Sequence, residues 1–301
     1  MSDLSDRRAG PLKLVPGGAP APAEYGAGHA AQWSRGRLHT LVIASGRGGV
    51  GKSSLAVNLA VALGQRGARV VLVDADLAQS NLDLLLGVHP RWDLGHDLAG
   101  EKSLDEVVVH GPANVTLVPG ASSAPTVELD DFRRELLLRS LGNADEGADL
   151  MIVDTGSSAD RETLELCRAA HELLVVATPD LASFSDAYGL VKTLQKEGAL
   201  ARAPGLVVNL ATTPEEADDA AQRMALFARH FLRLEVHVLG TVPYDASVTR
   251  AVRAQEPVVL AYPSSPAANA YRELAARLWK PVPSGPDSEL ASSEKSFRLE
   301  A

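Results

Sequence analysis

The sequence predicts an α/β fold in which a doubly wound, mainly parallel β-sheet is flanked by helices. Two observations carry this prediction: short apolar runs recur along the chain, and helical patterns lie between or after them. Seven runs are nearly continuous in Val, Leu and Ile, which is typical of strands buried on both faces of a sheet. These runs span residues 40–45, 69–76, 115–120, 149–156, 172–179, 205–211 and 236–243.

Helical patterns complete the alternation. They cover residues 54–66, 130–141, 185–196 and 267–278. Strands that alternate with helices through short connections form a parallel sheet, and its ligands bind beyond the carboxyl ends of the strands. We find no internal repeat of the length that would indicate a solenoid or a propeller.

The two ends of the chain differ from its middle. Residues 1–37 are rich in Gly, Ala and Pro and have no periodicity, so we expect a disordered arm. Residues 281–301 contain prolines that break helices, and we expect a flexible tail. The expected folded domain therefore spans residues 38–280.

Composition excludes several classes of protein. The formal net charge of -9 argues against a generally basic nucleic-acid binder. The single cysteine, Cys167, rules out a disulfide framework and any Cys-x-x-Cys site. We find no signal peptide and no run of about 18 apolar residues, so we expect a cytoplasmic protein.

A glycine-rich loop follows the first apolar run. Residues 46–53 read GRGGVGKS, which fits G-x-x-x-x-G-K-S. Glycines let backbone N–H groups converge on phosphate oxygens, and the following helix adds its positive amino-terminal end. Lys52 would reach the β- and γ-phosphates and Ser53 would ligate Mg²⁺, as in a P-loop NTPase. The alternative is a glycine-rich turn that binds nothing.

Three aspartates follow predicted strands. Asp154 ends the run 150–153, while Asp74 and Asp76 follow the run 70–73. A single aspartate at a strand end is more often a turn former or helix cap. Three such carboxylates at neighbouring strand ends instead indicate a site for a divalent cation and a polyphosphate.

These motifs resemble those of the MinD/ParA ATPases, whose deviant glycine-rich loop usually reads K-G-G-x-G-K-[ST]. The resemblance covers roughly residues 39–280 and is nearest the FlhG (FleN) flagellar-number regulators, with MinD next. Its further motifs are NLD at 81–83, DTGSSAD at 154–160, the run 175–194 and the run 240–259. The D-P-Q usual in ParA partition proteins is absent.

The resemblance implies roles for particular residues. Asp76 would orient the attacking water, Asp74 would support the metal and Lys52, and Asp154 would hold the metal through water. Asn209 would recognise adenine, for which an amide has a suitable donor and acceptor. The phosphates and Mg²⁺ would be held by Gly48, Gly49, Val50, Gly51, Lys52, Ser53 and Ser54. The base would be lined by Pro243 and Asp245.

The sequence also departs from the family. Arg47 stands where the family has its signature lysine, which reaches the nucleotide of the other subunit. Arginine keeps the positive charge, so we expect a catalytic role in trans; the alternative is a side chain in solvent. Gly156 is followed by two serines in place of the family's alanine. Neither the family's amphipathic C-terminal helix nor its glutamine-rich N-terminal partner motif is evident.

The predicted function is an ATP-dependent, dimerising switch that hydrolyses ATP to ADP and phosphate and regulates flagellar number or placement. Its cofactors would be ATP and Mg²⁺, and its partners a second copy and a protein of the flagellar or positioning machinery. Open alternatives are a MinD-like positioning ATPase and a non-hydrolysing nucleotide-bound adaptor. Peripheral contact with the inner membrane or cell pole also stays open. The missing Cys-x-x-Cys disfavours a metal-cluster carrier.

Overall fold

The computed structural model describes residues 38–77, 79–121 and 147–279 of the 301-residue chain. The predicted arm (1–37), the predicted helix at 130–141 and the predicted tail (281–301) lie outside these residues. The division of the chain into arm, domain and tail thus stays a prediction.

An eight-stranded sheet runs through the described part of the chain, in the order β3-β4-β2-β5-β1-β6-β7-β8. Its strands are β1 (His39–Ala44), β2 (Val70–Ala75), β3 (Val109–His110), β4 (Val115–Val118), β5 (Leu150–Thr155), β6 (Glu172–Ala177), β7 (Gly205–Ala211) and β8 (His237–Pro243). Neighbouring strands are parallel except for β3, which pairs with β4 in the antiparallel direction. The mainly parallel, doubly wound α/β fold is therefore confirmed.

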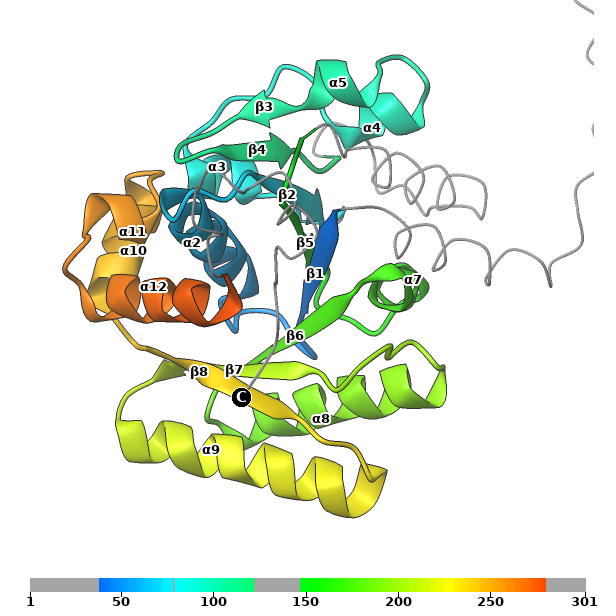
Figure 1. The fold of residues 1–301 in the computed structure, drawn as a ribbon, viewed down its shortest axis with the longest axis vertical. Helices are drawn as coiled ribbons and strands as arrows, with labels where there is room; N and C mark the ends of the chain where they lie inside the picture. The colour runs from blue at the N-terminus through cyan, green and yellow to red at the C-terminus, as the bar shows by residue number, and fades with distance from the viewer. Residues whose placement is uncertain (1–37, 78, 122–146, 280–301) are drawn as a thin grey trace, which may run out of the picture.

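Helices cover both faces of this sheet (Figure 1). They are α2 (Lys52–Gln65), α3 (Leu82–Leu86), α4 (Leu94–Leu98), α5 (Leu104–Val107), α7 (Arg161–Ala169), α8 (Leu181–Lys196), α9 (Pro214–Phe227), the π-helix η1 (Ala228–Leu232), α10 (Ala246–Arg253), α11 (Val258–Ala261) and α12 (Pro266–Leu278). The strands alternate in the faces that they present, since Leu41 and Ile43 pack with α2 and α12 while Val42 and Ala44 pack with α7 and α8. Two apolar cores result, one on each side of the sheet.

The connections place β1 at a topological switch point. The crossover from β1 through α2 leads to β2 on one side, and the crossover from β5 through α7 leads to β6 on the other. β1 therefore lies between β5 and β6, and the loop after β1 lies where the two halves diverge. In open α/β sheets ligands bind at such a point, beyond the carboxyl ends of the strands.

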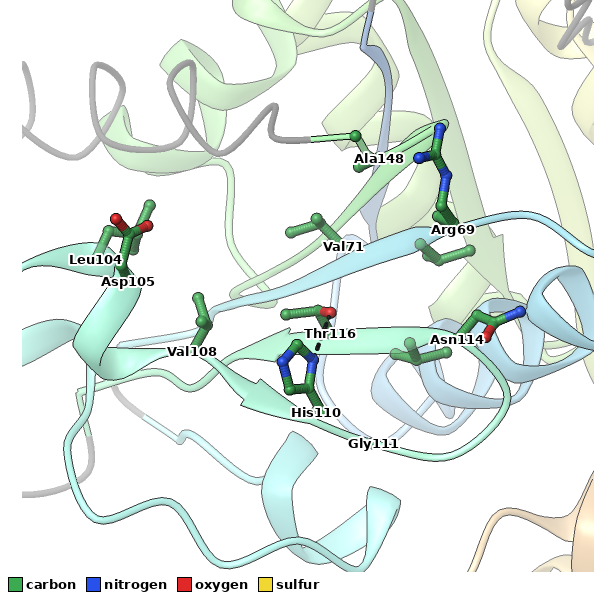
Figure 2. A pocket seen from close by; sticks show the side chains of 13 residues that line it. Arg69, Val71, Leu104, Asp105, Val108, His110, Gly111, Asn114, Thr116 and Ala148 are labelled. Carbon is green, nitrogen blue, oxygen red and sulfur yellow. Dashed lines mark hydrogen bonds between the residues drawn. The ribbon is translucent and has the colours of Figure 1, made fainter.

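A hollow of about 580 Å³ lies at the opposite edge of the sheet (Figure 2). Its walls include Arg69 and Val70 at the start of β2, Val115 at the start of β4, and Gly147 just before β5. Strand starts and strand ends lie at opposite edges of a parallel sheet, so this hollow is separate from the glycine-rich loop. Among the described residues, no helix combines the length and apolar character that crossing a membrane requires.

Candidate functional site

The glycine-rich loop (residues 46–53) joins the carboxyl end of β1 to the start of α2. Gly49 and Gly51 both have φ +81°, a left-handed conformation that residues with a Cβ rarely adopt. A Cβ on Gly46 would lie 2.2 Å from the backbone of Asp186 in α8, so the loop begins in close contact with that helix. Gly51 is also the N-cap of α2 and has no side chain with which to occupy the helix end. The first turn of α2 is thus left open to an anion.

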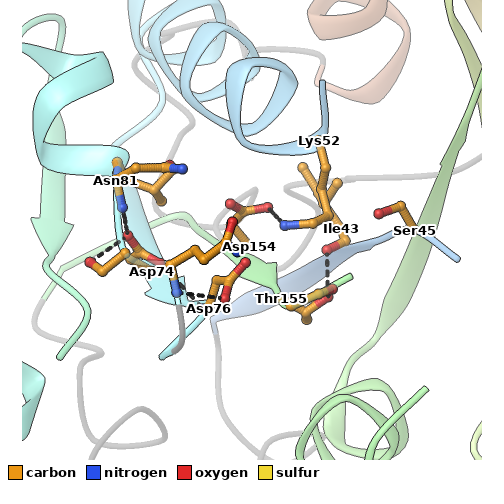
Figure 3. Close-up of polar contacts among 12 residues, drawn as sticks. Ile43, Ser45, Lys52, Asp74, Asp76, Asn81, Asp154 and Thr155 are labelled. Carbon is orange, nitrogen blue, oxygen red and sulfur yellow. Dashed lines mark hydrogen bonds and ion pairs between the residues drawn. The ribbon is translucent and has the colours of Figure 1, made fainter. Parts of the chain in front are cut away.

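Lys52 and Asp154 form the buried centre of the site (Figure 3). Lys52 Nζ donates to Asp154 Oδ1 at 2.7 Å, and the two side chains are 6% and 1% exposed. Burial raises the pKa of Asp154, while the Lys52 charge opposes that rise. The predicted lysine and the predicted strand-end carboxylate, 102 positions apart in the chain, are therefore in direct contact.

Asp154 retains capacity for a cation. Its Oδ2 is buried and has no hydrogen-bond partner among the described residues. Ser53 also lies near enough to lower the Asp154 pKa, but it does not satisfy Oδ2. An unpartnered carboxylate oxygen beside a serine hydroxyl fits a hard cation such as Mg²⁺, which prefers oxygen ligands.

Asp74 holds the segment after β2 in place. Its Oδ2 accepts hydrogen bonds from Ser80 Oγ, Asn81 N and Leu82 N at 2.9, 2.9 and 3.1 Å, and its Oδ1 accepts one from Asp76 N at 3.2 Å. Burial raises its pKa to about 6, against the effect of these hydrogen bonds, and the nearby Asp154 charge adds to the rise. Asp74 and Asp154 are register partners on adjacent strands. Asp74 therefore organises the segment, and its predicted support of the metal stays a prediction.

Asp76 lies at the edge of the same cluster. Its Oδ1 accepts a hydrogen bond from Gln79 N at 3.1 Å, and a Cβ on Gly156 would lie 4.0 Å from it. Its charge raises the pKa of Asp154. Asp154 thus repels both Asp74 and Asp76. Among the described His, Cys, Asp and Glu side chains, no group of three or more forms a ready metal site. A Mg²⁺ ion would therefore depend on Ser53, water and phosphate oxygens for most of its ligands.

The residues predicted to line the base have structural partners. Asn209 Nδ2 donates to Val50 O at 2.7 Å, and the side chain is 2% exposed. Asp245 caps α10 through Ser247 N at 2.8 Å and accepts from Ala267 N at 3.1 Å. Burial favours a higher pKa for Asp245, but these hydrogen bonds outweigh it and lower the pKa. Pro243 ends β8 two residues before this cap. Their predicted contacts with the base stay predictions.

Arg47 points to the surface beside α8. Its Nη1 lies 3.6 Å from Asp180 Oδ1 and its Nε lies 3.9 Å from Asp186 Oδ2, with 44% of the side chain exposed. Ser45 Oγ donates to Arg47 O at 2.9 Å and steadies the backbone there. Arg47, Gly48, Gly49 and Val50 form one wall of a surface cavity of about 490 Å³. Arg47 is thus placed at the exposed rim of the loop, whereas Lys52 is buried.

Sequence reasoning missed several residues that shape this site. Asp180 and Asp186 pair with Arg47, and Ser80 is bound to Asp74. The two aspartates lie within the run 175–194, and Ser80 directly precedes the NLD motif. All three residues therefore lie in or beside motifs that the sequence analysis named. The sequence did not predict which side chain each of these residues contacts.

Comparisons with known proteins point in one direction. A family model described as the CobQ/CobB/MinD/ParA nucleotide binding domain matches residues 41–258. The antiactivator FleN of Pseudomonas aeruginosa is 33% identical over 84% of this chain and 91% of its own. The flagellum site-determining protein YlxH of Helicobacter pylori is 31% identical over 73% of this chain and 74% of its own.

A solved structure extends the likeness to three dimensions. The septum site-determining protein MinD of Pyrococcus horikoshii, complexed with Mg-ADP, superimposes with a TM-score of 0.65 at 25% identity. The match covers 79% of this chain and 94% of that one. The family model, at residues 41–258, includes the candidate site from Arg47 to Asp245.

Proposed function

The chain belongs to the CobQ/CobB/MinD/ParA nucleotide-binding family, and we propose that it is an ATP-dependent, dimerising switch that hydrolyses ATP to ADP and phosphate. ATP and Mg²⁺ are its cofactors. The output is control of the number or placement of flagella, in line with the names of its relatives FleN and YlxH.

One observation carries the proposal. A glycine-rich loop at the switch point of a parallel sheet delivers Lys52 onto a buried strand-end carboxylate, Asp154, at 2.7 Å. Taking an ammonium group out of water is costly, and the pairing with Asp154 offsets this cost for the buried Lys52. Here the same ammonium lies at the open end of α2, where phosphate is favoured.

Different residues of the site would bind the phosphates, the metal ion and the attacking water. Lys52 and the amides of residues 48–54 would bind the phosphates, and Ser53 with Asp154 would hold Mg²⁺, which neutralises charge on the phosphate oxygens. Asp74 keeps the segment that carries Asp76 in place, and Asp76 would hold the attacking water by accepting its hydrogen bond. Loops fixed in this way change conformation when the γ-phosphate leaves, and partner proteins respond to that change.

A positioning ATPase like the solved MinD is the second candidate within the same family. Its chemistry at the site would be the same, and only the protein partner would differ. We propose a protein of the flagellar machinery as partner, together with residence in the cytoplasm and contact with the membrane or pole through such partners. The non-hydrolysing adaptor, in which Arg47 would stay beside Asp180 and Asp186, is the third candidate.

ATP turnover and assembly test the proposal together. The full chain is incubated with Mg-ATP, phosphate release is followed over time, and the products are separated by gel filtration. We expect slow release and an ATP-dependent dimer. Asp76→Ala should bind ATP and slow hydrolysis at least about tenfold, so that more dimer accumulates than in the wild type.

Two outcomes would contradict this. A wild type that binds ATP but releases no phosphate, with or without a dimer, would leave only the adaptor. An Asp76→Ala variant that hydrolyses at the wild-type rate would remove Asp76 from the mechanism. Asp218→Ala is a suitable control, because Asp218 is exposed on α9 and belongs to none of the motifs named above.

A further inference from the structure

We propose that Asn209 is a positioning residue that holds the main chain of the glycine-rich loop in its phosphate-binding shape. This is a role at the phosphate end of the site, separate from any contact with the base. The inference rests on the proposed function, since it concerns the same nucleotide site.

The contact is short, buried and long-range. Asn209 Nδ2 donates to the carbonyl of Val50 at 2.7 Å across 159 positions of sequence. Asn209 is 2% exposed and Val50 is 2% exposed, so water does not compete for this bond. A buried carbonyl deprived of its donor loses a hydrogen bond without replacement, which costs more than the bond contributes on average.

The direction of the Val50 carbonyl determines the direction of the next N–H. A peptide unit is planar and trans, so its C=O and N–H point in opposite directions. With the Val50 carbonyl directed at Asn209, the N–H of Gly51 must point away from it. Gly51 is one of the loop residues whose amide the motif provides for phosphate. By binding the Val50 carbonyl, Asn209 therefore fixes the orientation of the Gly51 N–H on the opposite side of the same peptide unit.

Gly51 and Asn209 fit one another closely. A Cβ on Gly51 would lie 2.3 Å from Asn209 Nδ2, and Gly51 has φ +81°. The amide thus occupies the space that any side chain at position 51 would need. This contact supplies a second reason, besides the backbone conformation, for glycine at that position.

The end of β7 is shaped to present this amide. Leu210, the next residue, has φ +60°, which is strained for a residue with a branched side chain. The pairing of β7 with β8 shifts register between Asn209 and Ala211. Register irregularities of this kind redirect side chains beside functional sites. Leu210 also lines the surface cavity with Gly48 and Gly49, so the strained residue lies next to the loop.

The two ends of the Asn209 amide allow the roles to be separated. Nδ2 is committed to the loop, whereas Oδ1 is buried and has no partner among the described residues. If Asn209 contacted only the base, its replacement would leave the conformation of the glycine-rich loop unchanged. Inorganic tripolyphosphate has phosphates and no base, so its affinity reports on the loop alone.

The experiment measures binding of Mg-ATP and of Mg-tripolyphosphate to the full chain by calorimetry. Asn209→Ala removes the donor, and Asn209→Leu removes it while keeping a similar volume, which covers the case in which the alanine variant does not fold. We expect both affinities to fall by a similar factor, about tenfold, as for the loss of one buried hydrogen bond near 1.4 kcal/mol. Hydrogen exchange of the peptide spanning residues 46–53 should become faster in the ligand-free variants.

Asn58→Ala is the matched control. Asn58 is also a buried asparagine that contacts backbone, because its Nδ2 donates to Ser54 O at 2.8 Å and its Oδ1 accepts from Val259 N at 3.2 Å. It lies further along α2, so its loss should reduce thermal stability without accelerating exchange across residues 46–53.

The outcomes distinguish failure of the proposed function from failure of the inference about Asn209. A wild type that binds neither Mg-ATP nor Mg-tripolyphosphate contradicts the proposed function. If the wild type binds ATP, and removal of the amide weakens ATP alone while exchange of residues 46–53 stays unchanged, Asn209 serves only the base and the inference is wrong. If the wild type binds ATP but not tripolyphosphate, the exchange of residues 46–53 decides: faster exchange supports the inference, and unchanged exchange overturns it.

Discussion

At the scale of single residues, the chemistry of the site depends on how two buried charges compensate each other. Lys52 and Asp154 are almost completely shielded from water, and each is the nearest counter-charge of the other. Removing one partner of such a pair destabilises the protein by more than the intact pair stabilises it, because the remaining charge is buried without a counter-charge. In the proposed function, the lysine would bind phosphate and the carboxylate would hold a cation.

Lys52→Ala is therefore expected to affect binding and folding together. Loss of a charge-assisted contact to phosphate should weaken ATP binding by about ten- to a hundredfold. The unpaired Asp154 should lower the free energy of unfolding of the ligand-free protein by about 3 kcal/mol or more, unless the carboxyl group takes up a proton. Calorimetric titration with Mg-ATP and thermal denaturation without ligand measure the two effects.

Lys102→Ala controls for the loss of a lysine. Lys102 pairs with the half-exposed Glu106 at 2.8 Å near α5, far in sequence from the loop. It should change neither ATP affinity nor stability by more than about 1 kcal/mol. Unaltered ATP affinity in Lys52→Ala would contradict the assignment of the glycine-rich loop as the phosphate site.

Gly46 offers a second prediction at this scale. A Cβ at this position would lie 2.2 Å from the backbone of Asp186, a distance that real Cβ atoms do not show, so α8 or the loop must move. We expect Gly46→Ala to lower the melting temperature of the ligand-free protein by several degrees, as overpacking typically costs about 1–3 kcal/mol. Gly48→Ala is the comparison, because its Cβ would lie 3.7 Å from Ser157 Oγ, in ordinary contact. Equal melting temperatures for the two variants would show that the loop accommodates the methyl group at Gly46.

The sequence alone identified the loop, Lys52, Ser53 and the three aspartates, because each belongs to a local pattern at the end of an apolar run. It also placed Asn209 at the site, but only by resemblance to a family. The contact of Asn209 with Val50 was beyond sequence reasoning, since it joins residues 159 positions apart through one amide. The pairing of Arg47 with Asp180 was missed for the same reason.

At the scale of elements, the amino ends of β1 and β6 share a pair of histidines. The rings of His39 and His171 stack with centroids 4.9 Å apart, and His171 Nδ1 accepts from Thr40 N at 3.1 Å. Burial lowers the pKa of His39 to about 3, with the neighbouring His171 and Arg202 charges adding to the effect. The folded state therefore resists protonation of His39.

This gives a prediction for the pH dependence of stability. A histidine whose pKa is lowered on folding takes up its proton more readily when the chain is unfolded, so stability is lost as the pH falls below about 6.5. His39→Phe keeps a ring against His171 but cannot titrate. Between pH 7 and pH 5 it should lose about 1–2 kcal/mol less stability than the wild type, as measured by denaturant unfolding at each pH.

His89→Phe serves as the control, because His89 is exposed. It should leave the wild-type pH dependence unchanged. If His39→Phe and the wild type lose the same stability on acidification, His39 does not contribute to acid sensitivity.

Among the described elements, the strands that come from apolar runs were predictable, whereas some helices, including the 14-residue α9, and the short elements were not. All seven apolar runs became strands, and the helix predicted at 54–66 is α2 (Lys52–Gln65). The helix predicted at 185–196 starts earlier, at Leu181, because Asp180 caps it through Ser183 N. Strand β3 has two residues, and α4 and α5 are short helices that depend on capping boxes at Asp93 and Ser103. Elements of this length owe their existence to caps and packing, which leave little periodicity in the sequence.

At the scale of the whole molecule, the sheet and its two cores leave one face of the glycine-rich loop open. Arg47, Gly48 and Gly49 are exposed there, beside the cavity of about 490 Å³. A second copy that met this face would bring its own Arg47 toward the nucleotide of the first copy. Assembly and catalysis would then depend on the same surface.

Arg47 is well placed for that role because little holds it in the monomer. Its contacts with Asp180 and Asp186 are long, at 3.6 and 3.9 Å, and the partners are 56% and 47% exposed. Exposed pairs of this kind contribute about 0–1 kcal/mol. Moving the guanidinium from these carboxylates to phosphate oxygens therefore costs little, and its planar fork suits two such oxygens.

Arg47→Ala should consequently lower ATP-dependent dimerisation and hydrolysis together, while the ATP affinity of the monomer stays within a few fold. Arginine residues that act in trans contribute about 10³–10⁵ in rate, and slow switches of this kind should lie near the lower end. Arg47→Lys should keep most of the dimer, because the positive charge remains. Arg229→Ala, which removes an arginine paired with Glu235 at the surface, controls for the loss of an exposed cation. Gel filtration and phosphate release with Mg-ATP measure both effects in one sample. If Arg47→Ala dimerises and hydrolyses like the wild type, the side chain stays with Asp180 and Asp186 in every state, and this site works without a cation from the second subunit.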